Sequence, residues 1–129
     1  MAQKHMEKIK LSHGLALDVW DCSREIAPDT DKVELYVTMT VYPDPAFFTE
    51  PLPYETTCKH FGESILFEYR NSRTFVLKSD RETVFRQLMD TFRQNVLPYL
   101  DTADFPRRFV LSKYQDILRN PFKYRQNNE

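Results

Sequence analysis

The sequence predicts an α+β domain, with an antiparallel meander sheet of four to five strands followed by two C-terminal helices packed on one face. Two observations lead to this class. Apolar and polar residues alternate in several segments between Lys8 and Lys78, as in half-buried antiparallel strands. The apolar spacing then becomes helical in the last third of the chain, so strands precede helices. A chain of 129 residues with 41% hydrophobic residues can bury a core of its own. We therefore place a single domain at residues 1–125.

The first predicted element is a hairpin. Its strands are Lys8 to Leu11 and Leu15 to Asp21, and Ser12-His13-Gly14 forms the turn, where glycine accepts the positive φ that tight turns need. The second strand alternates, with Leu15, Leu17 and Val19 on one face and Asp18 and Trp20 on the other. The hairpin therefore presents one apolar face to a core.

The segment from Val33 to Val41 is the clearest strand. Its odd positions are the apolar residues Val33, Leu35, Val37, Met39 and Val41, while Glu34, Tyr36, Thr38 and Thr40 point to the opposite face. The preceding segment, Ser23 to Asp31, is rich in turn-forming residues and is predicted to be a connection between neighbouring strands.

A proline-rich stretch follows this strand. Four prolines, Pro43, Pro45, Pro51 and Pro53, surround Ala46-Phe47-Phe48. Because proline lacks a backbone N–H, we expect a long loop here and neither a helix nor a central strand. Ser64 to Arg70 and Thr74 to Lys78 are then predicted to be two strands around Asn71-Ser72-Arg73, or one bent strand.

The last third predicts two helices. Ser79 and Glu82 have the spacing of a capping box, and apolar residues follow at helical spacing: Val84, Phe85, Leu88, Met89, Phe92 and Val96. Pro98 bends or ends this helix. The second helix begins near Asp104 with Pro106 in its first turn, and one face carries Val110, Tyr114, Ile117 and Leu118. Pro121 limits it, and the polar residues 126–129 are predicted to be a disordered tail.

Composition excludes several classes of protein. A net charge of −1 argues against a general polyanion binder, and no apolar run approaches the length of a membrane span. The polar N-terminus lacks the apolar stretch of a secretory signal, and two cysteines are too few for a disulfide scaffold. We therefore expect a cytoplasmic protein with free thiols at Cys22 and Cys58, no cofactor and no contact with a membrane.

Charge is distributed unevenly along the chain. The net charge is +2 over residues 1–14, −7 over residues 15–55 and +5 over residues 56–125. This pattern fits an ordinary solvated surface, but it also permits head-to-tail self-association or an acidic partner at the basic end. The basic end carries Arg107, Arg108, Lys113, Arg119, Lys123 and Arg125. Asp116 is the acidic residue among them.

Candidate chemistry is sparse. Cys58 and His60 would share a face if their segment were extended, and could then form a thiolate and base or half of a metal site. The spacings typical of zinc ligands are missing, so we interpret the pair as a structural cysteine beside a surface histidine. Trp20 to Arg24 gathers reactive residue types without a phosphate-binding loop or a nucleophile elbow. No catalytic residue and no metal ligand is assigned.

The main candidate surface is the sheet face opposite the core. It would carry Trp20, Tyr36 and Tyr42, which could form a dimer interface, stack on single-stranded nucleic acid, or lie under the proline-rich loop. Acidic side chains on the same strands disfavour nucleic acid because they repel phosphate. The predicted interaction surface comprises Trp20, Tyr36, Tyr42, Phe47, Phe48, Arg107 and Arg108.

Two segments carry a resemblance to a known family. Leu11-Ser12-His13-Gly14-Leu15-Ala16-Leu17-Asp18, followed by Trp20-Asp21-Cys22-Ser23-Arg24, resembles the opening of a family of small uncharacterised bacterial proteins, in which a similar hairpin leads into an Asp-x-Ser-Arg segment. The resemblance implies a bacterial cytoplasmic origin and a structural role for Asp21 and Arg24, for example as a salt bridge. It implies no activity.

The sequence as a whole predicts a non-catalytic module that binds itself or another protein. The alternative is a small-ligand-binding protein or an enzyme, with a pocket between the proline-rich loop and the sheet. Such a site would use Cys58, His60 or Arg24.

Overall fold

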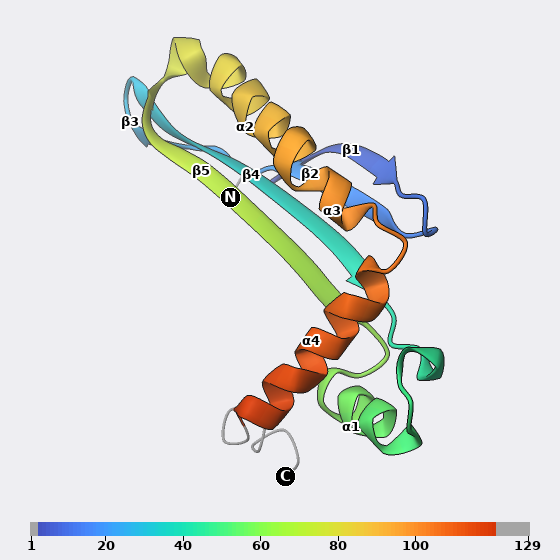
Figure 1. Cartoon of the computed structure of the whole chain (residues 1–129). Helices are drawn as coiled ribbons and strands as arrows, with labels where there is room; N and C mark the ends of the chain where they lie inside the picture. The colour runs from blue at the N-terminus through green and yellow to red at the C-terminus, as the bar shows by residue number, and fades with distance from the viewer. Residues whose placement is uncertain (1–2, 121–129) are drawn as a thin grey trace. The chain divides into compact units, whose positions relative to one another are not determined.

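A computed structural model describes residues 3–120 and confirms the α+β class (Figure 1). The elements in chain order are β1 (Lys4–Lys10), β2 (Ala16–Asp21), β3 (Arg24–Ala27), β4 (Thr30–Val41), η1 (Pro45–Phe47), α1 (Pro51–Phe61), β5 (Ile65–Leu77), η2 (Lys78–Asp80), α2 (Arg81–Asn95), α3 (Leu97–Leu100) and α4 (Phe105–Arg119). The predicted tail, residues 126–129, lies outside the described residues.

The chain divides into two compact units. Of the described residues, unit 1 holds 3–39 and 67–102, and unit 2 holds 40–66 and 103–120. Unit 1 therefore contains most of the sheet together with α2 and α3, whereas unit 2 contains η1, α1 and α4.

The five-stranded sheet has the order β1-β2-β4-β3, and β5 also pairs with β4. β1 pairs antiparallel with β2, and β2 and β3 both pair antiparallel with β4. Asp21 lies opposite Leu35 and Arg24 lies opposite Lys32, so β2 and β3 continue along the same edge of β4 in one register. β5 pairs with β4 and lies on its other side (Figure 1). The predicted meander is confirmed.

The segment from Ser23 to Asp31 differs from the prediction, because Arg24–Ala27 forms strand β3 and not a simple connection. A short polar break separates β3 from β2. The Ser23 backbone N–H donates to the Asp21 carboxylate at 2.9 Å, and the Glu34 backbone N–H donates to Ser23 Oγ at 3.0 Å. These bonds satisfy buried polar groups where the ladder is interrupted.

The two faces of β4 differ as predicted. The odd-numbered side chains from Val33 to Val41 are all at most 1% exposed. In unit 1 this face packs under α2, where Leu88 and Phe92 are also buried. The even-numbered face is polar and carries Glu34, Tyr36, Thr38 and Thr40. Burial of the aliphatic residues from both elements forms the core of unit 1.

The helix after β5 begins later than its capping pattern predicts. Residues 78–80 form the short helix η2, and α2 begins at Arg81 with Asp80 as its N-cap. Ser79 therefore does not cap α2, and the predicted capping box is wrong. Pro98 acts as predicted, since α2 ends at Asn95 and Pro98 lies in the first turn of α3.

The turn between β1 and β2 is held against the end of α3. The Ser12 backbone N–H donates to Asp101 Oδ1 at 2.7 Å, and this bond is the main cause that lowers the pKa of Asp101. His13 Nε2 donates to the Leu100 carbonyl at 2.8 Å. Gly14 has φ 96°, which is the positive φ predicted for this turn.

Unit 2 contains a helix that the sequence did not predict. α1 begins at Pro51, inside the stretch expected to be a loop. Proline fits the first helical turn because the N–H groups there have no partner within the helix. Thr57 is fully buried, and its hydroxyl donates to the Pro53 carbonyl at 2.8 Å.

The other helix of unit 2 is close to the prediction. α4 begins after Asp104, has proline in its first turn and buries Val110 and Ile117. Leu118 was expected on the same buried face, but it is 55% exposed. Position 118 lies next to the buried position 117 and turns about 100° away from it, which places Leu118 at the margin of the apolar face.

The residues from Ile65 to Leu77 form one strand, β5, in agreement with the bent-strand alternative. The alternation of burial in β5 ends at Arg73, and the strand geometry is interrupted at Phe75, whose φ is +58° and whose side chain is 81% exposed. Val76, the next residue, is buried. A positive φ is rare for an aromatic residue, so Phe75 marks a local backbone irregularity at the end of the strand.

Candidate functional site

A row of ring-bearing side chains crosses the sheet of unit 1 on the face opposite α2. His5 of β1 lies opposite Trp20 of β2, and Trp20 lies opposite Tyr36 of β4. Arg70 of β5 extends the row, with its guanidinium carbon 3.8 Å from the centre of the Tyr36 ring. The register of β1, β2 and β4 and the contact of Arg70 with Tyr36 bring these side chains together on one face, which we call the outer face.

Trp20 is held in place from two sides. Its indole N–H donates to Thr38 Oγ1 at 3.2 Å, and its ring meets the His5 ring edge-on, with centroids 4.8 Å apart. His5 Nε2 lies 2.9 Å from Asp18 Oδ1, and Lys8 Nζ lies 3.7 Å from the same oxygen. Trp20 stays half-buried, so part of its surface is accessible.

Tyr36 lies deeper and is 7% exposed. Its hydroxyl donates to the Glu68 carboxylate, and the Arg70 guanidinium covers its ring. Burial raises the pKa of Tyr36, and the hydrogen bond and negative charge of Glu68 raise this pKa further. The raised pKa favours the neutral form of the tyrosine. Its ring is the surface on which the Arg70 guanidinium stacks.

Glu34 forms ion pairs with two arginines on the outer face. Its carboxylate lies 3.4 Å from Arg70 and 3.8 Å from Arg24. The expected salt bridge between Asp21 and Arg24 is replaced by these contacts, since Asp21 accepts a bond from Ser23 and Arg24 lies beside Glu34. The pKa of the adjacent Cys22 is raised by burial first and by the charge of Glu34 second. A raised pKa favours the thiol form of Cys22 over the thiolate, which is the nucleophilic form.

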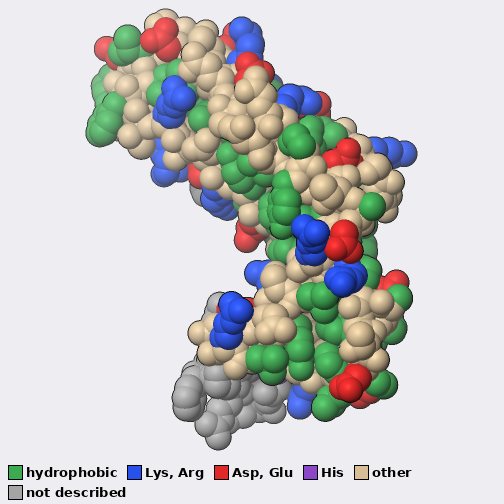
Figure 2. All heavy atoms as spheres, in the orientation of Figure 1, with side chains coloured by type: hydrophobic (Ala, Val, Ile, Leu, Met, Phe, Trp, Pro, Cys, Tyr) green, Lys and Arg blue, Asp and Glu red, His purple; other side chains and the backbone are tan. Residues whose placement is uncertain are grey.

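The outer face carries charges of both signs. Its basic side chains are Lys8, Lys10, Arg24, Lys32 and Arg70, and its carboxylates are Asp18, Glu34 and Glu68. Each of the three carboxylates lies beside a basic side chain or a hydroxyl of the same face. Figure 2 draws one side of the molecule, where basic and acidic side chains are interspersed among hydrophobic ones.

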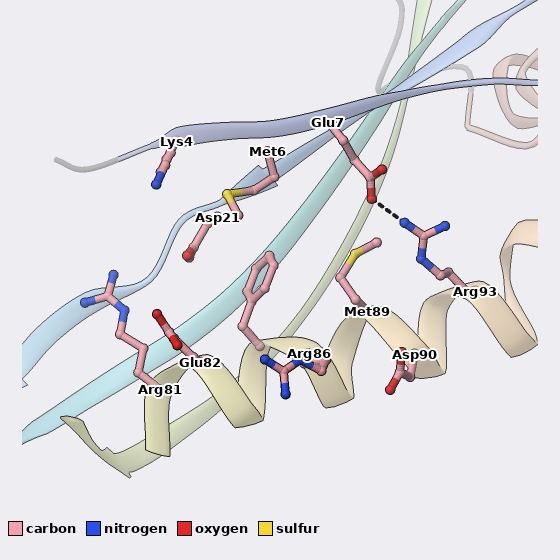
Figure 3. A pocket seen from close by; sticks show the side chains of 11 residues that line it. Lys4, Met6, Glu7, Asp21, Arg81, Glu82, Arg86, Met89, Asp90 and Arg93 are labelled. Atoms are coloured by element: carbon pink, nitrogen blue, oxygen red, sulfur yellow. Dashed lines mark hydrogen bonds and ion pairs between the residues drawn. The ribbon is translucent and has the colours of Figure 1, made fainter. Parts of the chain in front are cut away.

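A second feature of unit 1 is an open groove of about 740 Å³ between β1 and α2 (Figure 3). Its apolar lining consists of Met6, Phe85 and Met89. Its charged lining consists of Lys4, Glu7, Asp21, Arg81, Glu82, Arg86, Asp90 and Arg93. Figure 3 shows Glu7 of β1 paired with Arg93 of α2 across this groove. The sequence analysis missed the groove because its residues come from segments far apart in the chain.

Arg81 lines the groove and also forms an ion pair with the buried Asp31. Its guanidinium lies 3.1 Å from Asp31, and Lys78 Nζ lies 2.8 Å from the same carboxylate. The hydrogen bond from Lys78 is the main cause that lowers the pKa of Asp31. The Asp31 side chain is 1% exposed, whereas both cations are partly solvated. This pair holds the start of α2 against β4.

Five residues of the predicted interaction surface lie in unit 2. Phe48 packs edge-on against Tyr54 of α1 and Tyr114 of α4, with centroids 6.1 and 6.0 Å apart. Phe47 ends η1 and is half-buried, while Tyr42 is 58% exposed. Phe48 is therefore part of the packing of unit 2.

Arg107 and Arg108 also lie in unit 2. They approach the Asp104 carboxylate at 3.8 and 3.0 Å, from within the same helix. Sequence analysis considered Asp104 only as a helix cap and missed it as their counter-ion. Both arginine side chains are about half exposed.

The structure corrects the hypothesis about Cys58 and His60. Both lie on α1, where a separation of two residues turns the side chains about 200° apart. They therefore do not share a face. Cys58 instead forms a hydrogen bond with Tyr54 one turn away, which raises the pKa of the tyrosine. Both cysteines are free thiols, as predicted.

Residues 3–120 contain no group of three or more histidine, cysteine or acidic side chains arranged to hold a metal ion. Within the same range, no helix is long and apolar enough to cross a membrane. Comparisons of the chain with protein-family models, with curated proteins and with solved structures gave no match.

Proposed function

We propose that this chain is a non-catalytic protein-interaction module that binds its partner through the outer face of unit 1. The row from His5 through Trp20 and Tyr36 to Arg70 carries the proposal. Tryptophan, tyrosine and arginine are the residue types in which binding hot spots are enriched. Here one of each lies in adjacent positions on a single face.

The fixed geometry of these side chains supports the proposal. Trp20 is bonded to Thr38, Tyr36 to Glu68, and Arg70 to Glu34. A side chain that is already ordered loses less conformational entropy when a partner binds. The outer face is therefore organised before binding.

The carboxylates of the outer face favour a protein partner over nucleic acid. A phosphate backbone would meet the carboxylates of Asp18, Glu34 and Glu68 beside the arginines. A protein surface with both signs of charge can match the same pattern. We place this interaction in the bacterial cytoplasm, which fits the two free thiols and the resemblance of the opening hairpin.

Site-specific photocrosslinking tests the proposal. A photoreactive residue replaces Lys8, whose side chain is 60% exposed on the outer face, and a control replaces Glu82 of α2. We expect a discrete protein adduct from position 8 that is lost when Trp20→Ala and Arg70→Ala are added. Asp90→Ala, on α2, should leave the adduct unchanged.

A purified partner then allows a quantitative test. Trp20 is the only tryptophan, so its emission reports binding directly in the wild type. Arg70→Ala should weaken binding about 30-fold, the equivalent of a hot spot of about 2 kcal/mol. Equal binding by the wild type and by Arg70→Ala and Trp20→Ala variants, measured by calorimetry, would show that the outer face is not the binding surface.

The groove favours a second candidate function, the binding of a small ligand. Its volume of about 740 Å³ lies within the usual range of ligand sites, and an apolar lining with charges of both signs suits a zwitterion with an apolar body. Thermal-shift assays with aromatic amino acids provide the test. Stabilisation that disappears in Met6→Glu supports the groove. Stabilisation that persists in Met6→Glu, or none at all, contradicts it.

A further inference from the structure

Three strands of the sheet have an open edge, and the two long ones are built differently. Within the described residues, β1 pairs only with β2 and β5 only with β4, while the four-residue strand β3 also pairs only with β4. β1 carries Lys4, Lys8 and Lys10, and its register shifts between His5 and Glu7. Lysines and bulges on an edge strand prevent pairing with another chain. β5 has neither lysine nor proline between Ile65 and Leu77.

The edge of β5 is open over a regular run. From Glu68 to Thr74 every side chain is exposed or half-buried, and within residues 3–120 this strand pairs only with β4. An edge strand leaves alternate backbone N–H and C=O groups without a ladder partner. The run ends at Phe75, where the positive φ interrupts the strand geometry. Seven consecutive residues therefore offer a regular pairing edge, with Glu68, Arg70 and Arg73 as its charged side chains.

We propose that β5 pairs antiparallel with β5 of a second copy of this chain, with Asn71 on the two-fold axis. Most homo-oligomers are closed by such symmetry, in which the same patch is used on both copies. A two-fold axis perpendicular to the sheet places one residue opposite itself, because paired residues must point to the same face. Asn71 is the centre of the run from Glu68 to Thr74.

The charges of β5 favour this register over the one with Arg70 on the axis. With Asn71 on the axis, Arg70 faces Ser72 of the second copy, and Tyr69 faces Arg73 of the second copy. A tyrosine opposite an arginine is a favourable cross-strand pair. With Arg70 on the axis, two guanidinium groups would lie directly opposite each other, and like charges in that position are destabilising. Two asparagine amides on the axis can instead bond to each other.

This pairing would continue the outer face from one copy into the next. A perpendicular axis keeps the same face of both sheets on the same side, so two rows of His5, Trp20, Tyr36 and Arg70 would join. The pairing rests on the edge geometry and does not depend on the proposed binding function. Failure of one proposal therefore leaves the other standing.

Light scattering after size-exclusion chromatography tests the dimer with the full chain. At high micromolar concentration we expect a mass twice the 15.5 kDa of one chain. Asn71→Lys and Asn71→Asp should each be monomeric, because each sets two like charges opposite one another. An equimolar mixture of the two variants should recover the dimer. Circular dichroism spectra matching the wild type confirm that each variant is folded. A monomeric wild type would overturn the proposal.

Disulfide trapping tests the register. Asn71→Cys is placed in a Cys22→Ser, Cys58→Ser background, with Lys8→Cys as the matched control on β1. Residues opposite each other in an antiparallel pair have Cα atoms about 4.5 to 5.5 Å apart, which suits a disulfide. We expect a covalent dimer from position 71 and none from position 8. A dimer that survives Asn71→Lys, or that is trapped only at position 8, would contradict pairing through β5.

Discussion

The two faces of β4 come from one alternating sequence but are held by different forces. On the inner face, the five odd-numbered residues from Val33 to Val41 are at most 1% exposed under an apolar core. On the outer face, Glu34 and Tyr36 are also nearly buried, but their neighbours are arginine, glutamate and threonine. The comparison shows that burial alone does not reveal what a face contributes.

The free energies differ accordingly. Full burial of an aliphatic side chain contributes about 1.5 to 3 kcal/mol to folding. A hydrogen bond contributes only about 0.5 to 1.5 kcal/mol net, because the same groups bond to water in the unfolded chain. We therefore expect the inner face to supply most of the free energy of folding. The outer face is expected to fix the positions of the side chains that bind a partner. Four substitutions test this division.

Leu35→Ala on the inner face should have the largest effect. Leu35 is fully buried between α2 and the sheet, so its truncation removes apolar contacts and leaves a cavity. We expect a loss of about 2 to 5 kcal/mol in the free energy of unfolding. Urea denaturation measures it. A loss below that of Tyr36→Phe would break the division between the faces.

Asp31→Asn should rank second. Asp31 lies at the start of β4 and pairs with Lys78 and Arg81. The substitution removes the negative charge that both cations contact. The cost should be smaller than for Leu35→Ala, since both cations can hydrate and Lys78 keeps Glu25 at 2.7 Å. Thermal melts at neutral pH measure the difference.

The same residue predicts a pH dependence. Because the folded state lowers the pKa of Asp31, the unfolded state binds more protons in acid. Its contribution is present above the ordinary pKa near 4 and is lost as the pH falls through the lowered pKa. Asp31→Asn should therefore lose less stability than the wild type as the pH falls below about 4. Parallel acid titrations that do not converge would contradict this assignment.

Tyr36→Phe on the outer face should cost less, about 1 kcal/mol. The substitution removes the hydrogen bond to Glu68 but keeps the ring under Arg70. If the outer face fixes the positions of the side chains that bind a partner, Tyr36→Phe should weaken partner binding while the melting temperature falls by only a few degrees. Calorimetry of binding and of unfolding on the same sample separates the two effects.

Lys8→Ala should have the smallest effect. The Lys8 side chain is 60% exposed and its distance to Asp18 is 3.7 Å, so the ion pair is a solvated one. Such pairs contribute about 0 to 1 kcal/mol. We expect a change within about 0.5 kcal/mol in urea denaturation. A larger loss would show that the outer face also supports the fold.

Sequence analysis predicted most of the sheet and two of the helices, because period two and helical spacing are local patterns. It failed where local chemistry was compatible with two structures. Pro51 and Pro53 excluded a helix in the prediction, yet both fit the first turn of α1. β3 was missed because its four residues are all exposed and show no alternation.

The candidate site was predicted in part. The alternation of β2 and β4 placed Trp20 and Tyr36 on one face, and the register confirms that they lie opposite each other. Arg70 could not be assigned to them, because the pairing of β5 with β4 brings together residues 34 positions apart. The groove between β1 and α2 was missed for the same reason.

The sequence by itself determined the fold class, the two faces of β4 and the absence of a recognisable catalytic motif. These properties follow from the order of residue types along the chain. The spacing of apolar residues determines which side chains are buried on the same face. Only the tertiary structure decided that Arg70 covers Tyr36, that Asp31 pairs with Lys78 and Arg81, and that β5 pairs only with β4 within residues 3–120. Those outcomes depend on strand order and register, which bring distant segments into contact.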